Sequence, residues 1–171
     1  AWLRNLVSLN VVPSDYDASQ LLSWTNFYRN DGGNTLGIAY VRQACRYAYS
    51  CSLVEDRQDY NSFITVAHEF GHHFGVYHDG DNNPENLTEC TNSINYLMSG
   101  APNSNINRFY LSPCTIKSLI QNILVNNSFS CLANWPSVAF DYQYYGSFFP
   151  GQLHNLTEQC MLAFNASYYP M

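Results

Sequence analysis

The residues best suited to chemistry lie between His68 and Asp79, where the chain reads H-E-x-x-H-x-x-G-x-x-H-D. His68 and His72 are four residues apart, and because four residues of α-helix turn about 400°, both imidazoles project from one face. Gly75 can leave the helix in a backbone conformation that a side chain would resist, so the chain folds back and presents His78. Three neutral imidazoles bind zinc and leave its fourth position open, as in catalytic zinc sites.

Glu69 has a different role in the same motif. It follows His68 and can approach the metal without being a ligand, which suits a general base. Zinc polarises a scissile carbonyl as a Lewis acid and lowers the pKa of its water, and Glu69 would accept the proton of that water as it attacks. Helical histidines are usually surface or core residues, but this string fixes six positions, most of them rare residue types. The motif therefore predicts metal-assisted amide hydrolysis.

The elements that must position these residues follow from the pattern around them. Apolar residues predict a helix over 62–74 that buries one side, namely Phe63, Val66, Ala67, Phe70 and Phe74. Residues 20–24 and 36–41 read as short strands separated by a turn-rich loop at 29–34. A polar loop covers 79–95, and a second helix covers 113–125, opened by Ser112. The mixture indicates an α/β class.

Composition narrows the possible compartments and partners. The 171 residues suit one domain and carry a net charge of −6, with no basic patch for nucleic acid. No apolar stretch is long enough to span a bilayer. Six cysteines, none in a C-x-x-C pair, and four N-glycosylation sequons, at Asn86, Asn126, Asn155 and Asn165, favour secretion. The first residue is Ala1, and we expect the chain to be a fragment of a longer protein. His73 and His154 have no partner at ligand spacing and are expected at the surface.

The extended motif resembles the metzincin zinc metalloproteases, and Asp79 after the third histidine points to their adamalysin or reprolysin branch. Such proteases carry a methionine turn beneath the zinc. Met98, 20 residues past His78, is similar to that turn, whereas a lone methionine in an apolar run would otherwise be core filler. The resemblance implies a twisted mixed sheet packed on a long zinc-binding helix, with a C-terminal helix and disulfide bonds.

Further segments are similar to the ADAMTS-type members of this branch. They include 36–41, 51–56, Leu111 to Cys114, and Cys131 with Leu132. Residues 149–152 and 158–160 resemble the opening of a disintegrin-like region. The resemblance implies a catalytic domain over 1–138 that lacks its N-terminal part, then a linker and the start of a disintegrin-like region over 139–171.

The resemblance also implies a substrate cleft and a calcium site. The strand containing Leu36, Gly37, Ile38 and Ala39 would form the upper cleft edge and pair with an extended substrate, although an ordinary edge strand is the alternative. Asp17, the carbonyl of Cys131 and Asn134 match calcium ligands, all hard oxygen donors. Asp17 as a plain loop aspartate is the competing interpretation.

The family pattern would pair Cys45 with Cys131 and Cys90 with Cys114. It would join Cys51 to an upstream cysteine, but Val7 occupies the matching position here. Cys51 is then free, or bonded to Cys160 or to a residue outside the chain.

We therefore expect a secreted zinc endopeptidase that acts on extracellular proteins. Two alternatives stay open: a catalytically silent secreted binding or decoy protein on a zinc-ordered scaffold, and a zinc hydrolase of non-peptide substrates. Intact His68, Glu69, His72 and His78 favour the endopeptidase.

Overall fold

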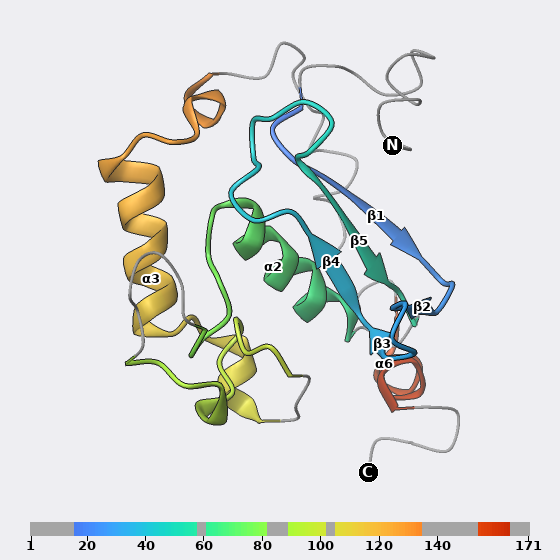
Figure 1. Cartoon of the computed structure of the whole chain (residues 1–171). Helices are drawn as coiled ribbons and strands as arrows, with labels where there is room; N and C mark the ends of the chain where they lie inside the picture. Colours follow the sequence, from blue (N-terminus) through green and yellow to red (C-terminus); the bar gives the residue numbers. More distant parts are fainter. Residues whose placement is uncertain (1–15, 58–60, 82–88, 102–104, 135–153, 165–171) are drawn as a thin grey trace.

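The computed structural model describes residues 16–57, 61–81, 89–101, 105–134 and 154–164. Five strands come first along these residues and the helices follow, and together they form a small sheet with helices beside it (Figure 1). The elements are β1 (Ser19–Ser23), β2 (Phe27–Tyr28), β3 (Asn34–Thr35), β4 (Gly37–Ala39), β5 (Cys51–Glu55), α2 (Ser62–His73), η1 (Asn92–Ile94), η2 (Ile106–Phe109), α3 (Pro113–Leu119), η3 (Ile120–Val125), η4 (Ser130–Ala133) and α6 (Leu156–Phe164).

The larger sheet is mixed and has the strand order β1-β5-β4. β5 runs parallel to β1 and antiparallel to β4, which confirms the predicted mixed sheet and α/β class. The two predicted strands correspond to β1 and β4, although Leu36 lies just before β4. β5 was not predicted as a strand, yet it is the central one. Between β1 and β4, the turn-rich loop forms the small β2–β3 hairpin.

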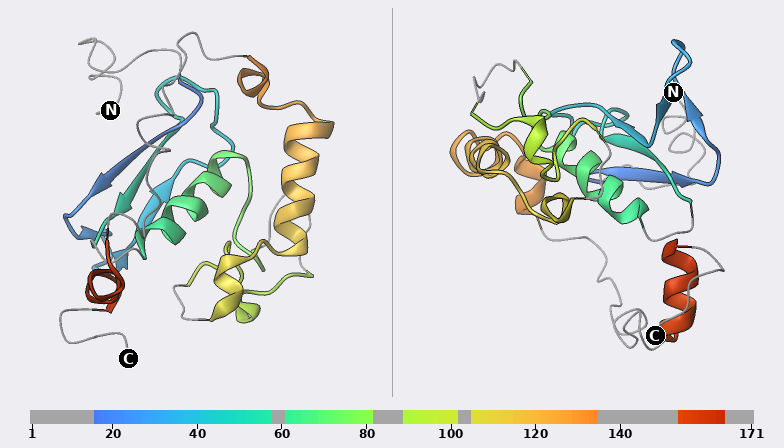
Figure 2. Two further views of the ribbon diagram at one scale, coloured as in Figure 1. Left: turned by 180° about the vertical axis from the view of Figure 1, so that it is seen from behind. Right: turned by 90° about the horizontal axis from the view of Figure 1, so that it is seen from below.

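Helix α2 lies between the sheet and the α3–η3 segment, as the views from the front and from below show (Figures 1 and 2). Its bounds match the prediction closely, but the expected burial of its apolar side holds only in part, because Val66, Phe70 and Phe74 are half-buried and Ala67 is exposed. Phe63 is exposed, and the buried residues of the helix are Glu69, His72 and His73. The reason is that the polar side of α2 faces the sheet, while Phe63 stacks on Phe109 and Phe74 contacts Phe129 edge-on.

The second helix also starts as predicted. Ser112 is its N-cap, and its side chain accepts a hydrogen bond from the Thr115 N–H at 3.0 Å. The helix changes from α to π geometry at Ile120, which the sequence did not predict. One turn later Asn126 ends it, as expected.

Two disulfide bonds cross-link the described residues, one between the two halves of the chain and one within the C-terminal half. They join Cys45 to Cys131 and Cys90 to Cys114, as the resemblance implied. Cys51 and Cys160 are unpaired, so the possible bond between them does not form. The predicted domain boundary near 138 lies outside the described residues. Within those residues, no helix is long and apolar enough to cross a membrane.

Candidate metal centre

The three motif histidines converge on one point. The Nε2 atom of His78 lies 3.1 Å from that of His68 and 3.2 Å from that of His72. In a tetrahedral zinc site with Zn–N distances of about 2.0–2.1 Å, neighbouring nitrogens are about 3.3–3.4 Å apart. The donor set therefore fits zinc in type, the two distances to His78 are close to this spacing, and all three ligand atoms lie within 4.8 Å of one another. Among the described residues, these three histidines form a cluster of side chains that could hold a metal ion.

Backbone carbonyls orient two of these imidazoles. His68 donates its Nδ1–H to the carbonyl of Leu97, and His72 donates its Nδ1–H to the carbonyl of Val76, both at 2.7 Å. These bonds fix the tautomer, so that each Nε2 presents its lone pair to the metal position. The third imidazole, of His78, has its Nδ1 3.4 Å from a carboxylate oxygen of Asp81.

Burial keeps the two helical histidines of the site, His68 and His72, neutral. Burial, followed by the neighbouring His72, lowers the pKa of His68 to about 4. Burial likewise lowers the pKa of His72. Because a metal binds neutral imidazole, both side chains are already in the ligating form at neutral pH.

Glu69 lies beneath β4, on the side of α2 that faces the sheet. Its side chain is only 4% exposed, and burial raises its pKa to about 7. A Cβ at Gly37 would overlap its Oε1 atom, so the glycine leaves room for this carboxylate under the strand. The Oε2 atom is buried and has no hydrogen-bond partner among the described residues. A buried carboxylate with a raised pKa is suited to accepting a proton.

Met98 lies directly against the zinc-binding helix. It is fully buried, and a Cβ at Gly71 would meet its sulfur at 2.5 Å. Its carbonyl accepts a hydrogen bond from the Asp79 N–H, and the preceding carbonyl, of Leu97, holds His68. The methionine segment thus contacts both ends of the motif.

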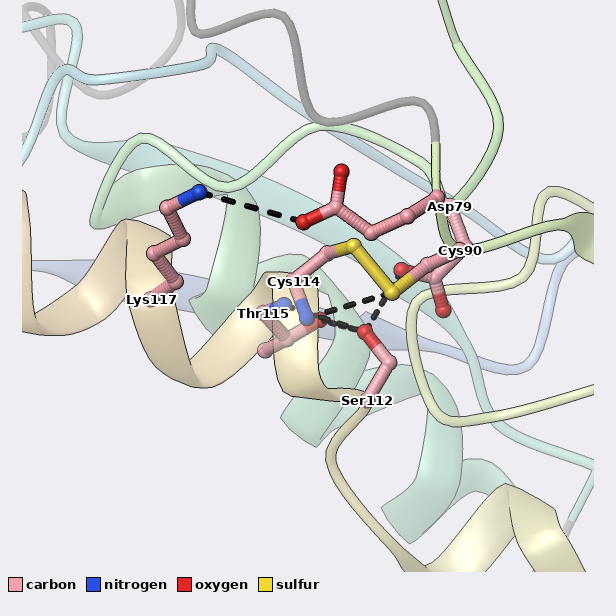
Figure 3. The surroundings of a disulfide bond; sticks show 7 residues. Asp79, Cys90, Ser112, Cys114, Thr115 and Lys117 are labelled. Atoms are coloured by element: carbon pink, nitrogen blue, oxygen red, sulfur yellow. Dashed lines mark hydrogen bonds and ion pairs between the residues drawn. A yellow bond between two sulfur atoms is a disulfide. The ribbon is translucent and has the colours of Figure 1, made fainter.

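Asp79 links the motif to the N-terminus of the second helix, α3, through a hydrogen bond. The Ser112 hydroxyl donates to Asp79 Oδ1 at 2.7 Å, beside the Cys90–Cys114 disulfide (Figure 3). Burial raises the pKa of Asp79, and the Ser112 hydrogen bond opposes that rise. Asp79 therefore makes a structural contact here rather than joining the three histidines.

The remaining predicted residues are placed as follows. Gly75 has a φ of +86°, as its expected role at the end of the helix requires. β4, which pairs with β5 in the described residues, has Ile38 exposed at its free edge. The Asp17 carbonyl accepts a hydrogen bond from the Cys45 N–H, and Cys45 is disulfide-bonded to Cys131, while the calcium site itself stays a prediction.

Sequence reasoning misplaced one residue and missed others. His73, expected at the surface, is fully buried, because it lies on the sheet side of α2 one residue after His72. Burial lowers its pKa to about 4. The orienting carbonyls of Leu97 and Val76 belong to the backbone, so residue types in the sequence could not indicate their role. Gly100, which packs against the His78 ring, has no such signal either.

Comparison with known proteins agrees with this geometry. Residues 2–126 match the family described as Metallo-peptidase family M12B Reprolysin-like. The chain is 32% identical over 139 residues to the human protein named a disintegrin and metalloproteinase with thrombospondin motifs 18, covering 81% of this chain and 11% of that protein. To the human protein of the same name with the number 6, it is 34% identical over 140 residues, covering 82% of this chain and 12% of that protein.

The chain therefore belongs to the reprolysin-like M12B metallopeptidase family and is of the ADAMTS type. It spans roughly a tenth of the length of these relatives. Members of such a family are metalloproteases that use zinc, and the three-histidine cluster has the matching donors.

Proposed function

We propose that this chain is the zinc-binding part of an endopeptidase that hydrolyses peptide bonds in extracellular proteins. The observation that supports this most strongly is the convergence of the three Nε2 atoms, with the buried Glu69 on the same helix. Zinc held by His68, His72 and His78 would supply Lewis-acid polarisation of the scissile carbonyl and activation of water.

The protein's own groups do the remaining work. Glu69, as the carboxylate, accepts the proton of the attacking water at one of its oxygens and passes it to the departing amine. A pKa near neutrality lets the same carboxyl group serve both steps. Leu97 and Val76 hold the two helical imidazoles in their ligating orientation throughout.

The substrate would bind along β4. Gly37 lies over Glu69, and the exposed Ile38 marks the free edge beside it. An extended peptide can add to such an edge as another strand, with backbone hydrogen bonds for affinity and side-chain pockets for specificity. This arrangement would bring a peptide carbonyl to Glu69, and it favours peptides over small non-peptide substrates.

Several features support an extracellular location. The two disulfide bonds require an oxidising compartment. Of the four sequons, Asn126 and Asn155 lie in the described residues, and both are exposed. Each has its side-chain oxygen bonded, to Gln121 and Glu158 respectively, so the amide nitrogen can carry a glycan. We infer secretion and glycosylation at these positions.

Calcium and the C-terminal region complete the proposal. The grouping of Asp17 near Cys131, through Cys45, supports a calcium site that uses Asp17, the Cys131 carbonyl and Asn134. Residues 139–171 would be a linker and the beginning of a disintegrin-like region that helps to select protein substrates, including those of the extracellular matrix.

The test is cleavage of a quenched peptide library by the purified protein. A chelator and the Glu69→Ala variant are the controls, and zinc content is measured in each sample. Cleavage that disappears in both controls, with zinc retained by the variant, supports the endopeptidase. A wild type that binds one zinc per chain and cleaves no peptide overturns it and favours a silent binding protein. Turnover of small esters but not peptides favours a non-peptide hydrolase.

A further inference from the structure

A second group of polar side chains encloses the turn that leads from His72 to His78. Asn122, in the π-helical segment η3, is fully buried beside Gly75. Its Nδ2 atom donates to the carbonyls of Phe74, at 3.2 Å, and Gly75, at 3.4 Å. These carbonyls follow the end of α2, where no further helical turn can satisfy them, so Asn122 supplies the missing donors.

Arg42 contacts the same turn beside Asn122. Its guanidinium donates to the Asn122 Oδ1 atom at 2.8 Å, and its backbone N–H donates to the carbonyl of His72 at 2.8 Å. Arg42 has a φ of +58°, a conformation that side chains rarely adopt. Such strain persists where the surroundings enforce it, and here the hydrogen bonds to His72 and Asn122 hold Arg42 in place. The Cys45–Cys131 disulfide holds this loop close to the C-terminal half.

Both side chains pack closely against Gly75. A Cβ at Gly75 would lie 2.7 Å from Asn122 Nδ2 and 3.0 Å from Arg42 Nε. The next residue, Val76, gives the carbonyl that orients the His72 imidazole. Three residues farther on, Asp79 is held by Ser112, at the other end of the same helical segment. The segment that carries His78 is thus anchored at both ends by one helix.

We propose that Asn122 and Arg42 are positioning residues for the metal centre. They fix the backbone from His72 to Val76, and through the Val76 carbonyl they set the orientation of the His72 ring relative to His78. Neither residue touches the metal position. The inference rests on the proposed zinc site, but it concerns the affinity and geometry of metal binding rather than catalysis.

The decisive variants separate the hydrogen bonds from the fold. Asn122→Asp keeps the acceptor for Arg42 and removes both donors to the turn. Arg42→Gly suits the positive φ and keeps the backbone N–H to His72, so it removes the guanidinium alone. Arg42→Lys is the conservative variant. Gln121→Leu is the matched control, because Gln121 is the exposed neighbour of Asn122 on the same turn.

The measurements are made on the full chain, with circular dichroism to establish folding. A chromophoric chelator in competition gives the zinc dissociation constant, and the visible absorption of the Co²⁺-loaded protein reports ligand geometry. We expect Asn122→Asp and Arg42→Gly to weaken zinc binding by about tenfold to a hundredfold and to alter the Co²⁺ spectrum. Arg42→Lys should recover part of the affinity, and Gln121→Leu should match the wild type.

Folded Asn122→Asp and Arg42→Gly variants with wild-type zinc affinity and an unchanged Co²⁺ spectrum would overturn the proposal. If Asn122→Asp does not fold, the Arg42 variants decide by the same two measurements. A wild type that binds zinc but cleaves no peptide defeats the proposed function and leaves this test intact.

Discussion

The two principal helices of the described residues share an unusual pattern but use it differently. Both bury polar side chains and expose apolar ones: α2 buries Glu69, His72 and His73, while the α3–η3 segment buries Thr115, Ser118 and Asn122. Apolar Ile116, Ile120 and Leu124 are exposed on the second helix.

The difference lies in what the buried polar groups contact. On α2, the imidazoles of His68 and His72 point to a shared metal position, and Glu69 keeps a buried oxygen without a partner among the described residues. On the second helix, Asn122 bonds to backbone carbonyls, and its N-cap Ser112 bonds to Asp79. The first helix therefore carries groups available for chemistry. The second helix anchors the segment between the two helices that carries His78. Variants in the two helices should therefore fail in different ways.

The largest effect should come from Glu69→Gln on the first helix. Removing the general base should lower peptide turnover by about 10²–10⁴-fold, because no other group takes the proton from the attacking water. Zinc content and thermal stability should not decrease, since the ligands and their carbonyl partners are untouched. Steady-state kinetics with parallel metal analysis measures both. Retained turnover would remove Glu69 from the chemical role.

Gly37→Ala tests whether the sheet positions that base. The new methyl group would overlap the Glu69 carboxylate, so the side chain or strand must shift. Because displacements of about 1 Å can cost about a hundredfold in rate, we expect a loss of that order in kcat with zinc binding kept. Gly33→Ala, in the exposed β2–β3 turn, is the control for altering a glycine. Equal kcat for Gly37→Ala and wild type would show that Glu69 is not held by β4.

The pH dependence of the thermal stability of the zinc-free protein tests whether the burial of the Glu69 carboxyl group destabilises the fold. The folded-state pKa of Glu69 is raised from 4.5 to about 7, so its contribution to stability is present at low pH and is lost as pH rises through 7. Glu69→Gln should therefore raise the melting temperature at pH 8 and leave it unchanged near pH 4. The lowered pKa of His68 acts oppositely, removing stability as pH falls from 6.5 toward 4. Thermal melts in chelator measure both trends, and a constant difference between variant and wild type would contradict the first.

The smallest effect should come from Ser112→Ala on the second helix. The variant loses the N-cap bond to Thr115 and the donor to the buried Asp79, so the free energy of unfolding should fall by about 1–2 kcal/mol. Turnover per zinc-loaded molecule should stay within a few-fold of wild type. Denaturant unfolding, with the exposed Ser93→Ala as control, checks this. Lost turnover without lost stability would contradict the structural role of this helix.

Much of the local structure could be predicted because it depends on neighbours in sequence. The bounds of α2, the N-cap at Ser112 and the positive φ at Gly75 follow from residue types and spacing. The failures are all non-local. β5 was missed because the burial of a central strand depends on its partners β1 and β4. The π segment that starts at Ile120 contains Asn122, whose hydrogen bonds to Phe74 and Gly75 likewise join segments distant in the chain.

The sequence by itself determined the chemistry of this protein, because helical geometry and a flexible glycine bring His68, His72 and His78 together from within eleven residues. Only the tertiary structure decided how those groups are tuned. The burial of Glu69 and His73, the carbonyls that orient the imidazoles and the anchoring of the Gly75 turn all come from segments distant in the chain. Desolvation and hydrogen bonding depend on what surrounds a side chain in space, and spacing along the sequence does not record it.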